Sequence, residues 1–237
     1  MHWLNLPRVD VDEMIDAPDQ PLADMDASMS DLARINALFG GTRAVIAETA
    51  RILRTTGPAQ STVRILDIGA GSGDIPRALA AWARVAGVDI SIVAVDNLEN
   101  MLRIASAKTQ EANIAYLQAD ALALPFAPAS FDIATCNLMF HHLGLERSAR
   151  VLAEMDRLST RGFVATDLRR DRLSLALVSA GIALVVAHPF TRHDGPASVR
   201  RAFTPREYEK IIALSGVQGV RMTSTWYSRM VLVKSKA

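Results

Sequence analysis

The stretch Ile65-Leu66-Asp67-Ile68-Gly69-Ala70-Gly71-Ser72-Gly73-Asp74 decides the fold of this chain. It begins as a buried strand, passes into a turn with glycine at every second position, and then starts a helix. Glycine lets the backbone pass close beneath a ligand, and such a turn places amide groups at a helix N-terminus. In open α/β sheets, this arrangement binds a nucleotide at the carboxyl edge of the strands. We therefore expect a ligand site around this loop.

Outward from the loop, short apolar segments alternate with helical ones. The pattern predicts strands over 63–68, 91–95, 114–118, 132–137 and 162–167, and helices over 74–86, 97–112, 144–159, 172–187 and 204–215. This alternation is typical of a parallel sheet with right-handed crossovers. Two last strands, 217–225 and 228–235, are split by a short turn around Tyr227, so the final strand should run antiparallel. The predicted fold is α/β: a Rossmann-like, doubly wound, mostly parallel seven-stranded sheet with an antiparallel last strand and a helical cap.

The segment before the first strand is expected to cover the site. Residues 1–27 are rich in Asp and Pro and predict an extended arm. Two helices should follow, one from Ser30 to Phe39 and one that ends at Gly57-Pro58. This gives an N-terminal arm with cap helices over 1–57 and one binding domain over 58–237, with a lid insertion at about 169–203. The length of 237 residues fits one large α/β domain with such a lid.

Composition and charge exclude several classes of protein. The chain is 50% hydrophobic and 22% charged, and its formal net charge is +1, which indicates a globular protein without overall attraction to nucleic acid. The longest apolar stretch, Leu173 to Ala187, is shorter than the roughly 20 residues of a membrane span, so we expect no stable membrane insertion. The single cysteine, Cys136, excludes an internal disulfide, and the N-terminus does not look like a secretory signal. These features favour a cytoplasmic protein.

Three carboxylates follow three consecutive strands, at Asp67, Asp96 and Asp120. Asp67 can meet the ammonium of an aminoacyl group, Asp96 the ribose hydroxyls, and Asp120 the amino group of adenine. Alone, Asp96 would also fit a helix N-cap and Asp120 a turn. The dinucleotide fingerprint needs glycine at position 74, where this chain has Asp74, and no Gly-Lys-Ser/Thr of a phosphate-binding loop follows. A cationic or zwitterionic nucleoside ligand is therefore favoured over a pyrophosphate.

The segments ILDIGAGSGDIP, VAVDNLENML and LQADALALPFAPASFDIATCNLMFHHL resemble class I S-adenosylmethionine (SAM)-dependent methyltransferases, especially the ubiquinone- and menaquinone-biosynthesis branch. The resemblance covers about residues 63–167 and implies SAM as cofactor. It implies the following binding residues: Asp67, Gly69, Ala70, Gly71, Gly73, Asp96, Asn97, Met101, Asp120, Ala121 and Asn137. The loop would bind the methionine part and Asp96 the ribose. Asn97 and Met101 would flank the adenine, Asp120-Ala121 would bind its edge, and Asn137 would lie by the methionine amine and sulfonium.

The expected cap indicates a small apolar substrate. Helix 172–187 is apolar almost all round, which favours an acyl chain, an aromatic ring or a prenyl group as its neighbour; a buried helix or a homodimer interface is the alternative. A basic stretch from Thr191 to Arg201, which includes Arg192, could bind a carboxylate, phenolate or phosphate, but a solvated surface loop is the favoured interpretation. No aromatic residues interleave with it, so it offers no stacking platform for RNA or DNA.

The pair His141-His142, just beyond Asn137, supplies the candidate catalytic base. A neutral imidazole accepts a proton from a phenol or carbon acid near neutral pH. His142 is the first choice, because in the quinone-type sequences that the chain resembles the second position of the pair tends to face the pocket; capping or filling a pocket wall is the alternative role. No carboxylate matches the pair by spacing, so we expect no metal.

The resulting hypothesis is a SAM-dependent methyltransferase of secondary metabolism that O- or C-methylates a small apolar or aromatic, phenolic or polyketide-like metabolite. The arm DLARINALFGG and the tail TRHDGPASVRRAFT resemble bacterial methyltransferases of polyketide-type small molecules, which favours this substrate class. Two rivals are an NAD(P)-dependent oxidoreductase and a non-catalytic SAM-binding protein. Asp74 and the lack of a Tyr-x-x-x-Lys pair disfavour the first rival, and the three carboxylates disfavour the second.

Overall fold

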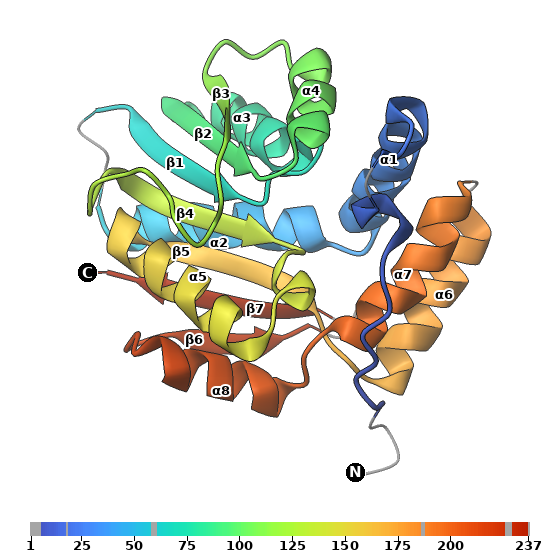
Figure 1. The fold of residues 1–237 in the computed structure, drawn as a ribbon. Coiled ribbons are helices and arrows are strands. Elements are labelled where there is room, and N and C mark those ends of the chain that lie inside the picture. The colour runs from blue at the N-terminus through green and yellow to red at the C-terminus, as the bar shows by residue number, and fades with distance from the viewer. Residues whose placement is uncertain (1–5, 18, 58–60, 186–187, 226–228, 237) are drawn as a thin grey trace.

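A single seven-stranded sheet organises the computed structural model, which describes residues 6–17, 19–57, 61–185, 188–225 and 229–236. Its order is β3-β2-β1-β4-β5-β7-β6. The strands are β1 (Val63–Ile68), β2 (Ile90–Asp96), β3 (Ile114–Gln118), β4 (Phe131–Asn137), β5 (Ser159–Leu168), β6 (Arg221–Ser224) and β7 (Arg229–Ser235). Strands β1 to β5 pair in parallel, and β7 pairs antiparallel with both β5 and β6 (Figure 1). The predicted fold class is confirmed.

Helices cover both faces of the sheet because successive side chains of a strand point to opposite faces. Leu66 and Ile68 of β1 belong to a core with α5 (Leu145–Leu158) and α8 (Pro205–Ser215). Val63 and Ile65 pack on the other side, with α2 (Gly41–Thr55) and α3 (Asp74–Ala86). All four of these side chains are buried. The strand is therefore apolar on both faces, as expected for the centre of a parallel sheet.

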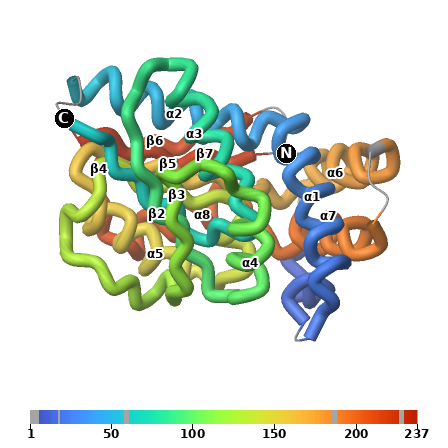
Figure 2. The backbone as a smooth tube through the Cα atoms, turned by 90° about the horizontal axis from the view of Figure 1, so that it is seen from above, coloured from blue at the N-terminus to red at the C-terminus, as the bar shows by residue number. Residues whose placement is uncertain are grey.

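A cap of three helices, α1 (Leu22–Leu38), α6 (Arg172–Val185) and α7 (Pro189–Arg201), lies beyond the carboxyl ends of the strands. Figure 1 shows these helices gathered beside the sheet, with the N-terminal arm running along α7, and Figure 2 shows the same group at one end of the molecule. Ile35 and Phe39 pack against Val178 and Ile182 of α6. No helix in the described parts of the chain is long and apolar enough to cross a membrane.

The prediction of an extended arm over 1–27 was wrong in part, because α1 begins at Leu22 rather than near Ser30. Met25 and Met29 in its first turns are buried against Met101 of α4 (Glu99–Lys108). Tertiary packing thus makes a helix from a stretch whose Asp residues obscured the apolar period. Before α1, the described arm is irregular apart from a short 3₁₀ turn over Met14–Asp16.

The prediction of a solvated loop over the basic stretch was also wrong, because this stretch is helix α7. Gly195 and Pro196 lie inside the helix and weaken its sequence signal. The helix nevertheless buries Thr191 and Asp194. Smaller differences lie at element ends: α4 stops at Lys108, β5 begins at Ser159 and β6 begins at Arg221. The predicted turn around Tyr227 and the last two residues of predicted helix 172–187 lie outside the described residues.

We predict that Gly162→Ala destabilises the fold far more than Gly87→Ala. Gly162 has φ +139° in β5, and a Cβ there would collide with the carbonyl oxygen of Lys234 in β7. Gly87 has φ +66° after α3, but no described heavy atom lies within 4 Å of the position that its Cβ would take. Backbone strain costs about 1–2 kcal/mol at each site, and the clash adds about 1–3 kcal/mol at Gly162. Urea unfolding of both variants measures the difference; equal losses would contradict the clash.

Candidate active site

A cavity of about 460 Å³ opens between the carboxyl ends of the central strands and the cap. Of the predicted site residues, those that line it are Asp67, Gly69, Ala70, Gly71, Asp96, Asn97, Met101, Asp120, Ala121, Asn137, His141 and His142. Gly73 does not line it; it is the N-cap of α3, where a Cβ would collide with the hydroxyl of Tyr116. The fold therefore brings the predicted cofactor residues and the histidine pair to one space, and Gly73 contributes through the shape of the loop.

The glycine loop needs its glycines for conformation. Gly69, Gly71 and Gly73 have φ values of +72°, +51° and +75°, a region that other residues enter only with strain. The amides of Gly69 and Ala70 both donate to the carbonyl oxygen of Val95 in β2 at 2.9 Å. This ties the turn to the neighbouring strand and leaves the end of the loop beside the cavity.

Asp67 is a buried carboxylate at the end of β1. Its Oδ1 accepts a hydrogen bond of 2.6 Å from the Thr135 hydroxyl. Burial raises the pKa of Asp67 to about 8, the Thr135 hydrogen bond lowers it in part, and the nearby charges of Asp74 and Asp96 raise it further. A cationic group of a ligand would relieve the cost of ionising this carboxyl, so the site favours a ligand with an ammonium.

Asp96 and Asp120 line the cavity, and each also accepts hydrogen bonds from backbone amides. Asp96 Oδ2 accepts from the Gly71 amide at 2.8 Å and Oδ1 from the Leu98 amide at 3.0 Å, which joins the glycine loop to the start of α4. Asp120 is exposed and accepts from the Leu122 amide at 2.9 Å, as a turn residue does. Each carboxylate oxygen keeps a second lone pair for a ligand. The expected N-cap role of Asp96 was wrong, because Leu98 is the N-cap of α4, but its hydrogen bonds and the turn role of Asp120 leave both residues able to bind a ligand at the cavity.

The cap supplies the apolar wall of the cavity. Met29, Leu32 and Phe39 line it from the α1 side, and Leu177 and Val178 line it from α6. The apolar helix predicted over 172–187 therefore faces the cavity, in agreement with a small apolar neighbour. Of the basic stretch, neither Arg192 nor Arg201 lines this cavity.

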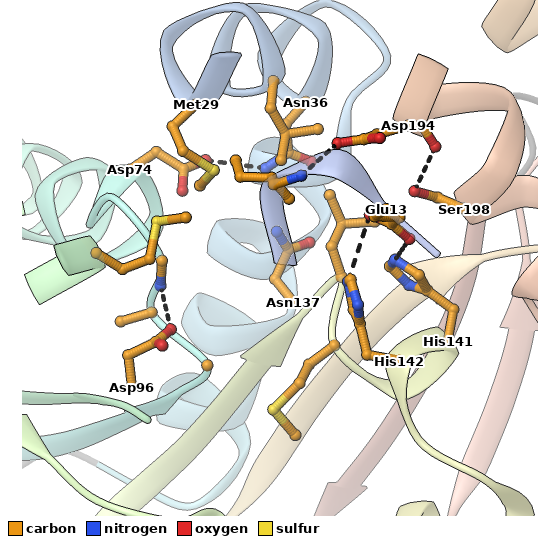
Figure 3. Close-up of a pocket in the computed structure, with 18 of the residues that line it drawn as sticks. Glu13, Met29, Asn36, Asp74, Asp96, Asn137, His141, His142, Asp194 and Ser198 are labelled. Atoms are coloured by element: carbon orange, nitrogen blue, oxygen red, sulfur yellow. Dashed lines mark hydrogen bonds and ion pairs between the residues drawn. The ribbon is translucent and has the colours of Figure 1, made fainter. Parts of the chain in front are cut away.

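The histidine pair lies in a corner of the cavity formed with carboxylates from two segments. His141 is buried, and its Nδ1 lies 2.7 Å from Asp167 Oδ1 in β5. His142 is half-buried, and its Nδ1 lies 3.0 Å from Asp16 Oδ2 in the arm. Both Nε2 atoms face Glu13, at 3.7 Å from Oε1 for His141 and 3.8 Å from Oε2 for His142 (Figure 3).

Glu13 could not be predicted as a site residue, because it lies far from His141 and His142 in the sequence. It reaches them only because the arm packs beside them in the fold. The carboxylate of Asp194 in α7 accepts from the backbone amides of Met14 at 2.7 Å and Ile15 at 3.1 Å, which fixes the arm in place. The interpretation that no carboxylate accompanies the histidines is therefore wrong. Burial raises the pKa of Glu13 to about 7, although His142 opposes this rise. The run Asp-Glu-Met-Ile-Asp carries no local pattern that would predict this position.

A second missed group lies beside the glycine loop. Arg229 at the start of β7 is buried, and its Nη2 donates to Asn36 Oδ1 at 2.9 Å. Asn36 Nδ2 in turn donates to Asp74 Oδ2 at 3.1 Å. All three residues line the cavity. A guanidinium thus accompanies the carboxylates at the loop end of the cavity, although the sequence places it almost at the end of the chain.

Comparisons with known proteins agree with this geometry. Residues 65–162 match the family model described as a methyltransferase domain. Over 78 residues the chain is 42% identical to demethylmenaquinone methyltransferase of Lactococcus lactis subsp. lactis, a match that covers 30% of this chain and 28% of that protein. Over 100 residues it is 37% identical to ubiquinone/menaquinone biosynthesis C-methyltransferase UbiE of Rickettsia prowazekii, covering 38% of this chain and 40% of that protein. The chain thus spans less than half the length of these relatives.

Solved structures extend the likeness to nearly the whole chain. The plantazolicin methyltransferase BpumL, in complex with a monoazolic desmethylPZN analog and SAH, superposes with a TM-score of 0.59 at 14% sequence identity. The match covers 91% of this chain and 96% of that one. At this identity the likeness shows a shared fold. Together with the family match, it confirms the resemblance to class I SAM-dependent methyltransferases.

We predict that, without ligand, Asp67→Asn is more stable to unfolding than the wild-type protein, and that this advantage grows as pH rises. An unfolded Asp ionises near its ordinary value of 3.8, whereas folded Asp67 ionises near 8, so between these values the folded state binds the extra proton. Wild-type stability should therefore fall from about pH 4 to pH 8, and the variant should avoid this loss. Its advantage should reach about 1 kcal/mol or more at pH 8. Urea unfolding at pH 5, 7 and 9 measures it, with the exposed Asp89→Asn as control; an advantage that does not grow with pH would refute the cause.

Proposed function

We propose that this protein transfers a methyl group from SAM to a small apolar or aromatic acceptor. The observation that carries the proposal is the shared cavity, in which a glycine loop with three acidic neighbours meets an apolar wall and a histidine pair. The methyltransferase-domain match over 65–162 supports the reaction class. A pyrophosphate cofactor is disfavoured because Asp74, held by Asn36, stands where the dinucleotide fingerprint needs its third glycine.

The cofactor fits the loop end of the cavity by charge. The ammonium of the methionine part would meet Asp67, and its carboxylate would meet Arg229 with Asn36. Asp96 would bind the ribose hydroxyls through the lone pairs that the Gly71 and Leu98 amides leave free. In this pose the adenine lies between Asn97 and Met101, with Asp120-Ala121 at its edge. The sulfonium then points past Asn137 toward the apolar wall.

The acceptor would occupy the space between Asn137 and the cap. Transfer is in-line attack of a nucleophilic atom on the methyl carbon, with a neutral thioether as the leaving group, so alignment and exclusion of water supply most of the acceleration. The names of the quinone-biosynthesis relatives support an aromatic ring methylated at carbon. The imidazole corner supports a phenolic oxygen equally, because a phenol must lose its proton. We therefore propose one of these two acceptor classes. A homodimer, a cytoplasmic location and a role in secondary metabolism stay predictions.

One imidazole of the pair His141-His142 would accept the proton that the acceptor loses. Each imidazole hydrogen-bonds a carboxylate through Nδ1, to Asp167 for His141 and to Asp16 for His142, which leaves Nε2 as the atom that faces the cavity corner. His142 remains our first choice because it is the less buried of the pair. His141, enclosed and fixed by Asp167, would position it.

We predict that Asp96→Ala weakens SAM binding by about 1.5–3 kcal/mol, the range for a lost hydrogen bond to a charged group. Asp96→Asn keeps one acceptor oxygen and should lose less. The control variant Asp89→Ala makes the same change at an exposed aspartate away from the cavity, and it should bind SAM as wild type does. Isothermal titration calorimetry measures all three. Unchanged affinity in Asp96→Ala would remove this residue from the ribose role.

We predict that His142→Ala lowers the turnover rate roughly 10²–10⁴-fold while SAM affinity is retained, because the positioned base is lost. His141→Ala should instead cost mainly stability, about 1–3 kcal/mol, because Asp167 would be left buried without its partner. The rates should be measured with chelator-treated protein, so that the imidazoles act as free bases. The reverse pattern would move the base to His141, and normal rates in both variants would show that the acceptor arrives already ionised.

A further inference from the structure

We propose that Glu13, His141 and His142 form a binding site for one divalent transition-metal ion at the acceptor end of the cavity. One nitrogen from each histidine and a carboxylate oxygen of Glu13 all lie within 4.8 Å of one another. The inference deepens the proposed function, on which its catalytic meaning rests, but metal binding can be measured without turnover. Four observations carry it: spacing, ring orientation, burial and charge.

The spacing fits a bridging ion better than direct hydrogen bonds. The Nε2 atoms lie 3.7 Å and 3.8 Å from the two Glu13 oxygens, beyond the usual range of an N–H···O hydrogen bond. An ion about 2.0–2.2 Å from each ligand spans atoms up to about 4 Å apart. The separation between the imidazoles and the carboxylate is thus the one that a shared metal ion requires, and small side-chain movements would complete the shell.

The orientation of both rings is that of metal ligands. Each Nδ1 is engaged by a carboxylate, Asp167 for His141 at 2.7 Å and Asp16 for His142 at 3.0 Å. These contacts fix the tautomer that protonates Nδ1 and directs the Nε2 lone pair toward Glu13. A histidine that binds a metal through one nitrogen almost always donates the other N–H to such a carboxylate or carbonyl. Here both members of the pair have this arrangement, whereas a capping or space-filling role would require neither.

Glu13 is buried, and its carboxylate is only partly compensated, by a hydrogen bond with Ser198 and by the charge of Arg201. Its side chain is 5% exposed, and within the described chain its Oε1 has no hydrogen-bond partner. The nearest guanidinium nitrogen, from Arg201, lies 3.6 Å from Oε1 and 3.7 Å from Asp16. The ligands and their Nδ1 partners therefore bring three carboxylates, Glu13, Asp16 and Asp167, against one guanidinium. When Glu13 is ionised and the imidazoles are neutral, this excess of negative charge matches a divalent cation.

Two imidazoles and a carboxylate suit zinc and the neighbouring first-row ions, and leave coordination positions open. An acceptor hydroxyl bound there would release its proton to solvent more easily, because the ion stabilises the oxyanion. The oxygen would then attack the SAM methyl carbon, and the sulfur would keep the electron pair of the broken bond. In the metal-loaded protein the ion thus takes over the activation that an imidazole supplies in the metal-free one. Since Glu13 belongs to the arm, the same ion would hold the arm closed.

The test is zinc binding by the untagged full chain after removal of metals with a chelator. We expect one Zn²⁺ per chain, measured by calorimetry and by metal analysis after gel filtration. Glu13→Gln and His142→Ala should each weaken binding more than about 100-fold, since a ligand is lost. Asp16→Asn should weaken it about 10–100-fold, as loss of a partner of a ligating histidine does. His188→Ala, which removes a histidine outside this cluster whose Nε2 lies 3.3 Å from Asp24, should bind zinc as wild type does.

Folding and cofactor binding are followed separately in each variant by SAM titration. A wild-type protein that binds SAM but retains well under one equivalent of zinc overturns the metal site and leaves the proposed function standing. Zinc affinity that is unchanged in both Glu13→Gln and His142→Ala, in variants that still bind SAM, also overturns it. Zinc binding without SAM binding would instead sink the proposed function alone. Ligand-field absorption bands of bound Co²⁺ that disappear in Glu13→Gln would assign the ligands directly.

Discussion

The right-handed crossover between parallel strands is the constraint on which the rest of the structure depends. From the centre of the sheet, β1 leads through α3 to β2 on one side, and β4 leads through α5 to β5 on the other. The two helices must therefore lie on opposite faces of the sheet. Neither helix covers the space beyond the carboxyl ends of β1 and β4. Asp67 at the end of β1 and Asn137 at the end of β4 border this opening. The cap helices then convert an open edge into an enclosed cavity.

The buried carboxylates around the cavity differ in how their charge is compensated. Burial alone would raise the pKa of Asp167, but the contact with His141 and backbone N–H groups outweigh it and hold the pKa below its usual value. Asp67 and Glu13, which line the cavity, have pKa values raised to about 8 and 7. Carboxylates that are costly to ionise in the free protein are those that a cationic partner can stabilise. The protein thus gives up stability at the positions where a ligand would restore it.

Sequence reasoning reached the sheet and its loop because both depend on local signals. The apolar run from Val63 to Ile68 and the glycines after it specify strand, turn and helix within a short window, and the family match and the sheet order confirm that interpretation. The cap was harder. Helix α1 owes its first turns to contacts of Met25 and Met29 with α4, and α7 contains Pro196, so neither shows a clear period. Glu13 and Arg229 reach the cavity through contacts between distant segments, for which a single sequence holds no signal.

The clasp between Asp194 and the arm has a consequence for how this protein can change. Because the carboxylate binds the main-chain amides of Met14 and Ile15, these two hydrogen bonds do not depend on the side chains at those positions. Substitutions other than proline therefore leave these hydrogen bonds in place, although a polar residue at Ile15 would lose its packing against Met25 and Met29. Glu13 and Asp16, which face the histidines, flank the two anchored amides, so their side chains can change while the anchor is kept. The arm is therefore a segment in which evolution or protein engineering can alter chemical specificity without changing the rest of the fold.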